Sequence, residues 1–188
     1  MTVFVWTKMG VESGEKLEQI VRRKEAERVK GNGQFWWGVG NSLGPAVRDA
    51  ARAQGGTLPV LFSVMLGRPK AADSSPDMVS RWTSWEDEGG RIHAIPSHAK
   101  VISRGSTAKS RHYALVCHTD DPLALERSGA RFDPSRCRTP FGKLPGASQV
   151  TALLQGDPDM HESGPYQICF RAVLVDPWAV KLLGPRSV

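Results

Sequence analysis

The residues best suited to bind a ligand lie in one short segment, Gln34–Ser42, which contains two adjacent tryptophans, two glycines and an asparagine. Neighbouring side chains on an extended backbone point to opposite sides, so at most one of Trp36 and Trp37 belongs to a site. Gly38 lets the backbone approach a flat ligand, and Asn41 offers a donor and an acceptor to a nucleobase edge. The competing interpretation is that the tryptophans fill the core at a turn.

A second aromatic pair, Trp82 and Trp85, lies in a stretch rich in Ser, Pro, Gly and Asp. Their spacing of three places both rings on one side of a single helical turn, where they can close a cage over a bound base. The alternative is that they fasten a long loop to the core, which the following acids Glu86–Glu88 favour because these would repel phosphate.

The stretch Arg91–His112 is the best candidate for binding a polyanion, because it contains no acidic residue. One-sided charge of this kind can follow a phosphate backbone, although a solvated loop has the same composition. Its basic members are Arg91, His93, His98, Lys100, Arg104, Lys109, Arg111 and His112. By contrast, the bases of residues 16–30, among them Lys24, alternate with acids such as Glu27, which is typical of a solvent-exposed helix face.

An enzymatic reading rests on Gly40–Gly44, which matches the Gly-x-Ser-x-Gly pattern of a nucleophile elbow with Ser42 as the nucleophile. Asp120 or Asp121 and then His161 would complete the hydrolase order. However, such a sheet needs several parallel strands before the elbow, and only one or two fit into the first 40 residues. We therefore expect a non-catalytic protein and keep a small serine hydrolase as an alternative.

The three cysteines, Cys117, Cys137 and Cys169, are far apart and form no Cys-x-x-Cys pair. The histidines do not approach ligand-pair spacing with them either, so we expect neither a disulfide framework nor a metal site. No other cofactor is predicted. The cysteine pattern fits a reducing compartment, and we expect a cytoplasmic protein.

Hydrophobic periodicity predicts the elements that must position these residues. Helices are expected from Ser13, as N-cap, to about Lys30 and from Pro45 to Gly55. Strands are expected at 2–6, 35–39, 58–66, 92–95, 99–103, 113–119 and 166–175. A long excursion, or a loop with one irregular helical turn, is expected at about 67–91. A further long loop is expected at about 120–165, within which periodicity does not assign Val150–Gln155. The pattern predicts an α+β domain with two N-terminal helices and a bent or closed sheet of five or six strands.

The 188 residues, of which 40% are hydrophobic, are enough for one compact domain covering 1–188. The longest apolar run, Leu58–Leu66, is too short to cross a bilayer, so no membrane association is expected. With 25 Lys and Arg against 19 Asp and Glu, the net charge of +6 favours a polyanionic partner. The oligomeric state is not predicted.

The segment Trp36-Trp37-Gly38-Val39-Gly40-Asn41 resembles the Trp-x-Gly-Val-x-Asn signature of EVE domains, which belong to the PUA-like superfamily together with the YTH domains that bind methylated adenine. The opening strand Phe4–Lys8 is similar to the family's first strand and its Lys-Ser element. Leu61–Val64 is similar to the YTH strand of the same composition. The likeness covers residues 2–66, but Gly40 stands where EVE domains usually carry Arg.

The resemblance implies a bent β-barrel whose pocket accepts a flipped or single-stranded modified base of DNA or RNA. Trp36 would lie against the base, Asn41 would bond its edge, and Thr7 and Ser63 would be hydroxyls at the pocket rim. Lys8 would join the phosphate-binding residues. Stacking on an aromatic ring returns about 1–3 kcal/mol to an unstacked base. A protein-interaction barrel with a vestigial pocket is a further alternative.

Overall fold

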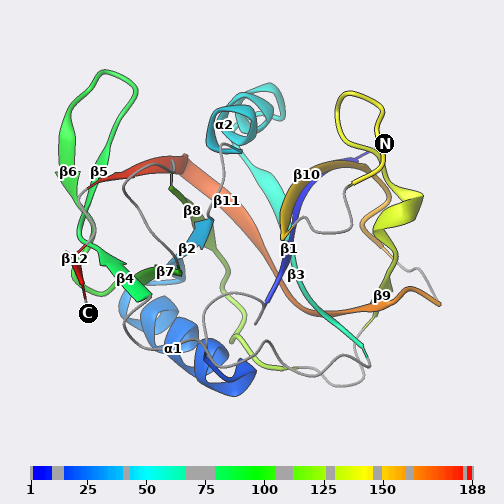
Figure 1. The fold of residues 1–188 in the computed structure, drawn as a ribbon, viewed down its shortest axis with the longest axis horizontal. Helices are drawn as coiled ribbons and strands as arrows, with labels where there is room; N and C mark the ends of the chain where they lie inside the picture. The colour runs from blue at the N-terminus through cyan, green and yellow to red at the C-terminus, as the bar shows by residue number, and fades with distance from the viewer. Residues whose placement is uncertain are drawn as a thin grey trace.

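The computed structural model describes residues 2–9, 15–39, 43–66, 79–104, 112–125, 130–145, 150–159, 163–183 and 186–187, with the backbone alone at 79–81, 102–104 and 186–187. Two α-helices lie on opposite sides of a large sheet (Figure 1). Both expected N-terminal helices are therefore confirmed among the described residues.

Helix α1 spans Leu17–Lys30 and helix α2 spans Gly44–Ala53. The N-cap of α1 is Lys16, whose backbone N–H donates to Gln19 Oε1 at 2.9 Å, so the expected cap at Ser13 is wrong. Ser13 itself lies outside the described residues. Pro45 occupies the first turn of α2, as expected from its fixed φ and its missing N–H.

The described residues contain all seven strands that periodicity predicts, and five more. The expected strands are β1 (Thr2–Lys8), β2 (Gln34–Val39), β3 (Leu58–Met65), β6 (Ile92–Ala94), β7 (Val101–Arg104), β8 (Tyr113–His118) and β11 (Tyr166–Leu183). The additional strands are β4 (Val79–Trp82), β5 (Ser84–Glu86), β9 (Arg131–Phe132), β10 (Thr151–Gly156) and β12 (Arg186–Ser187). The helical turn expected within 67–91 is wrong for its described part, because residues 79–82 and 84–86 form strands.

The larger sheet has nine strands and is mixed and unclosed. Its main path runs β10-β1-β3-β11-β5-β6, while β8 and β9 also pair with β11, and β2 pairs with β8. The pair β1–β3 is parallel, and the other strand pairs described in this sheet are antiparallel. A smaller sheet has the order β12-β4-β7. The α+β class is thus confirmed, whereas a closed barrel of five or six strands is not.

Strand β11 joins the parts of the larger sheet. Its first half pairs with β3, and its second half pairs with β8 and β5. The register with β8 shifts between Leu174 and Ala179, where Trp178 has a φ of +59°. The strand expected at 166–175 is longer in the structure, because the chain bends near Pro177 and continues to Leu183.

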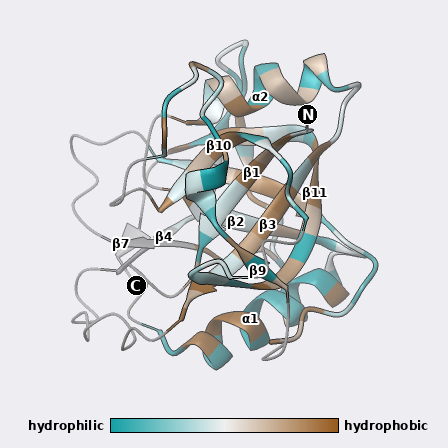
Figure 2. Cartoon of the chain, turned by 90° about the vertical axis from the view of Figure 1, so that its right-hand side faces the viewer, coloured by the Kyte–Doolittle hydropathy of each residue, from teal (hydrophilic) through white to brown (hydrophobic). Residues whose placement is uncertain are grey.

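Buried side chains form three clusters. The central cluster includes Val5, Phe35, Phe62, Leu115 and Leu174. The Trp6 cluster includes Phe4, Trp6, Phe132 and Tyr166, and the Trp36 cluster includes Trp36, Trp82, Val101, Val116 and Leu182. Figure 2 shows hydrophobic colour along much of β1, β3 and β11, whereas α1 carries both hydrophobic and hydrophilic residues. Neither described helix is long and apolar enough to span a membrane.

Replacing Phe62 by Ala is expected to lower the free energy of unfolding by about 3–5 kcal/mol, because its fully buried ring stacks on Phe170 with centroids 4.6 Å apart. Urea unfolding followed by circular dichroism measures the loss. Phe141 is the matched control: it is 87% exposed, so Phe141→Ala should change stability by less than about 0.5 kcal/mol. Equal losses in the two variants would contradict the assignment of the central cluster.

Candidate functional site

Three of the predicted site residues come together in the Trp36 cluster. Trp36 and Trp82 are almost completely buried there, at 3% and 4% exposure, and the half-buried Trp85 packs against them. The ring centroids of Trp36 and Trp85 lie 6.2 Å apart at an interplanar angle of 58°. Because Trp36 is sealed in, Trp85 is the ring of this group that a ligand can reach most directly.

Trp82 and Trp85 come together, but not through the predicted helical turn. Trp82 ends β4 in the smaller sheet, whereas Trp85 lies in β5 of the larger sheet, so the chain passes from one sheet to the other at Thr83. On β6, His93 is the cross-strand partner of Trp85, and the two rings stack with centroids 4.4 Å apart. Trp82 lies 5.0 Å from the ring of His112.

The acids that follow Trp85 each have a basic partner. Glu86 Oε2 accepts from Lys181 Nζ at 3.0 Å, and Glu88 forms an ion pair with Arg52. Asp87 Oδ2 lies 2.8 Å from His93 Nε2, and this hydrogen bond lowers the pKa of Asp87. The repulsion of phosphate expected from this acidic run is therefore reduced.

Thr7 and Ser63 lie apart from Trp36, Trp82 and Trp85, and their side chains are on opposite faces of the sheet. Their side chains are fully buried. Thr7 lies on the same face of β1 as Val5 of the central cluster, and its Oγ1 lies 2.8 Å from Thr151 Oγ1, whereas Ser63 Oγ accepts from Trp6 Nε1 at 2.8 Å. Both hydroxyls are thus engaged inside the protein, away from a solvent-accessible rim.

Few of the predicted phosphate-binding residues can be placed near the tryptophans. Arg91 is exposed beside the β5–β6 turn, and the exposed Lys100 precedes β7. The Nζ of Lys8 lies over the ring of Trp6, in a different cluster. For Arg104 the backbone alone is described, and Lys109 and Arg111 lie outside the described residues.

The strand and helix that flank the Gly-x-Ser-x-Gly match are present, but Asn41 and Ser42 lie outside the described residues, as does His161. Gly38 lies within β2, which pairs antiparallel with β8. Gly44 has a packing role, because a Cβ at this position would overlap the ring of Tyr113. This glycine therefore needs no catalytic explanation.

The described residues contain no group of three His, Cys, Asp or Glu side chains arranged to hold a metal ion. The three cysteines are free and buried. Burial raises the pKa of Cys169 to about 11 and raises that of Cys117 further, so both thiols stay protonated at neutral pH and are poor nucleophiles.

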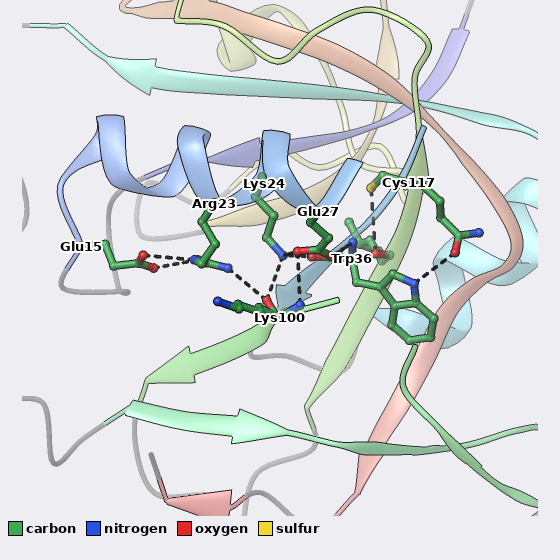
Figure 3. A network of polar contacts seen from close by, with 9 residues as sticks. Glu15, Arg23, Lys24, Glu27, Trp36, Lys100 and Cys117 are labelled. Atoms are coloured by element: carbon green, nitrogen blue, oxygen red, sulfur yellow. Dashed lines mark hydrogen bonds and ion pairs between the residues drawn. The ribbon is translucent and has the colours of Figure 1, made fainter. Parts of the chain in front are cut away.

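A buried ion pair of α1 holds Trp36 in place (Figure 3). Lys24 Nζ lies 2.9 Å from Glu27 Oε2, and both side chains are at most 3% exposed. The expectation that these two residues lie on a solvated face is therefore wrong. Glu27 accepts from the backbone N–H of Trp36 at 2.6 Å and from that of Lys100 at 3.3 Å, while Lys24 donates to the carbonyl oxygens of the same two residues.

These four hydrogen bonds of Lys24 and Glu27 join Trp36 of β2 to Lys100, two extended segments whose backbones do not bond each other at these residues. On its other side β2 pairs with β8, and Lys100 lies directly before β7. Desolvation outweighs the attraction of Glu27 and lowers the pKa of Lys24 to about 8. Arg23 adds a hydrogen bond to the Lys100 carbonyl oxygen at 3.0 Å.

Trp37 is an aromatic candidate that the sequence analysis did not select. It faces away from Trp36, toward the central cluster, where its half-buried ring meets Phe62 edge to face at 4.9 Å. The strict alternation of β2 indicates that the two tryptophans separate, but it does not indicate which one stays accessible.

Comparison with known proteins finds no matching family model, no matching curated protein and no matching solved structure. The candidate site therefore rests on the chain's own residues.

Replacing Glu27 by Gln is expected to lower the free energy of unfolding by about 3–5 kcal/mol, because it leaves the Lys24 ammonium buried without a counter-charge. Chemical denaturation measures the loss. Asp49→Asn is the matched control, since Asp49 and Arg52 form an i,i+3 pair on α2 that is largely exposed and should contribute at most about 1 kcal/mol. A loss for Glu27→Gln no larger than the control's would show that the buried pair does not hold the segments together.

Raising the pH should stabilise the wild-type protein relative to Lys24→Met. The pKa of Lys24 is about 8 in the folded chain and near its ordinary value of 10.5 in the unfolded chain. Between these values the unfolded chain binds the extra proton, so the contribution of Lys24 to the free energy of unfolding rises with pH. The difference between the two proteins, measured from about pH 7.5 to about pH 10, isolates this contribution because other groups titrate in both. A constant difference would mean that Lys24 titrates normally.

Proposed function

We propose that the chain is a non-catalytic nucleic-acid-binding domain of EVE-like, PUA-like architecture that recognises a modified base, either flipped or single-stranded. The observation that carries this proposal is the convergence of Trp36, Trp82 and Trp85 from three different strands. An aromatic group of this kind suits the flat, uncharged face of a nucleobase, because every base has a π-face that can stack on an indole ring.

Trp85 provides the accessible ring of the proposed site, and Trp36 and Trp82 support it from inside. One face of Trp85 stacks on His93, which fixes the orientation of the indole. A base that stacks on the remaining exposed part of the ring gains about 1–3 kcal/mol, and a methyl group on the base adds apolar contact area. Gly38 and Asn41 stay predictions for contacts with the base edge, whereas Thr7 and Ser63 are not part of the proposed site.

The charge distribution is compatible with a phosphate backbone at this end of the molecule. Arg91 and Lys100 present exposed side chains on the segments that flank the Trp36 cluster, and the acids nearest Trp85 are paired with basic residues. The net charge of +6 adds a long-range attraction for polyanions. We expect binding to weaken steeply as salt is added, since each phosphate contact releases counterions.

Replacing Trp85 by Ala should reduce affinity for oligonucleotides that carry the recognised base by at least about fivefold, the equivalent of one lost stacking contact. Fluorescence anisotropy against a panel of methylated and hydroxymethylated DNA and RNA oligonucleotides measures the effect. Trp178→Ala is the matched control, because Trp178 is also half-buried but lies beside Gly56 and Arg52. Both variants must keep the wild-type circular dichroism spectrum. Equal affinity of Trp85→Ala and wild type, or a wild type that does not prefer any modified base, would refute the proposal.

A further inference from the structure

An exposed aromatic side chain stands on the surface between β9 and β10. Phe141 is 87% exposed and Leu144 is 58% exposed, in the segment Arg138–Pro145, which we name the Phe141 loop. The two residues are three positions apart in this loop, and large apolar side chains exposed on one loop can form part of a binding surface.

The Phe141 loop has defined internal bonding, so the phenyl ring is held outward. Thr139 N–H donates to the Lys143 carbonyl oxygen at 2.7 Å, and Gly142 N–H donates to the Thr139 carbonyl oxygen at 2.8 Å. Gly142 has a φ of +75°, a conformation that favours glycine. At the base of the loop, Arg138 and Gln155 exchange backbone hydrogen bonds of 3.0 and 2.7 Å, which fix the loop to β10.

Exposed basic residues flank Phe141 along the sequence. Arg136, Arg138 and Lys143 are all exposed, and within the described part of the chain none of them forms an ion pair with an acid. The nearby Asp133 accepts from the backbone N–H and the hydroxyl of Ser135. Arg138 donates to the carbonyl oxygens of Ser135 and Cys137 at 2.9 and 2.8 Å, so its guanidinium is anchored to the loop but has no acidic partner among the described residues. An exposed aromatic ring with such cations beside it in the chain is complementary to nucleic acid, which presents flat bases beside phosphates.

We propose that the Phe141 loop is a second nucleic-acid contact, in which Phe141 stacks on a base or inserts between two bases while Arg138 and Lys143 bind the adjacent phosphates. This inference rests on the proposed function, because it assigns a further contact to the same ligand. It does not require that the base at Phe141 be modified.

The position of the loop determines how long the ligand must be. It lies at the opposite end of the long axis from β5 and β6, which carry Trp85 and His93 (Figure 1). A domain of this size is about 40 Å across. A duplex that touches both ends therefore covers about 12 base pairs at 3.4 Å each. A 20-base-pair probe is long enough to reach both sites.

The experiment measures binding of a 20-base-pair DNA duplex, and of an RNA strand with the same sequence, each with and without the modified base preferred by the wild type. Phe141→Ala should lower affinity for the better-bound probe by at least about fivefold while leaving the preference for the modified base unchanged. Phe141→Trp should keep wild-type affinity because it retains an aromatic ring. The double variant Arg138→Gln/Lys143→Gln should reduce the slope of log affinity against log salt by about two.

The outcomes separate this inference from the proposed function. If Phe141→Ala binds as the wild type does, the loop contact is refuted and the site at Trp85 stands. If Phe141→Ala weakens binding while Trp85→Ala leaves the preference for the modified base intact, the loop contact stands and the site at Trp85 falls. A wild type that binds neither probe refutes both. Phosphatidylserine vesicles are the competing ligand: binding to them that depends on Phe141, with no such effect on nucleic acid, would also overturn the inference.

Discussion

The buried pair of Lys24 and Glu27 is the contact on which the arrangement of the two sheets depends. It satisfies the backbone N–H and C=O groups of Trp36 and the N–H of Lys100, and it shares the Lys100 carbonyl oxygen with Arg23. A buried backbone group left unpaired costs about 1–3 kcal/mol. The pair therefore allows the segment before β7 to lie beside β2 although no backbone bond joins them at these residues, and this places the smaller sheet over the Trp36 cluster.

The same pair links folding to the proposed site. Glu27 accepts from the backbone N–H of Trp36 and Lys24 donates to its C=O, so the backbone that carries the indole is held in position on β2. The indole ring packs beneath Trp85. Trp36 acts in this arrangement as the support for the accessible ring rather than as the ligand-facing surface that the EVE resemblance implies. The cost of burying the two charges is offset by their mutual attraction and by their hydrogen bonds to the backbone of β2 and of the segment before β7.

Much of the fold follows from local sequence pattern, whereas the candidate site depends on long-range contacts. The strand expected at 113–119 and the alternation along 166–175 correctly predict β8 and the first half of β11. Strands β4 and β5 were not predicted, because they are short and derive their pairing from β7 and β11, far away in sequence. The burial of Lys24 and Glu27 could have been predicted from their spacing. With Ile20 they occupy positions i, i+4 and i+7, which form one face of a helix, although the many charged residues of this segment suggested an exposed face.

The two tryptophans of β2 illustrate why an alternating pattern predicts that neighbouring side chains point in opposite directions but does not predict which of them binds a ligand. Trp36 enters the cluster covered by the smaller sheet, and Trp37 enters the central cluster against Phe62. The backbone of β2 lies between them, so a ligand stacked on Trp85 is separated from Trp37 by a strand. Accessibility is then decided by what covers each face, and the cover over Trp36 comes from residues 82–101, which the signature segment does not contain. A short motif therefore fixes the direction of its side chains, while distant segments decide which of them can meet a ligand.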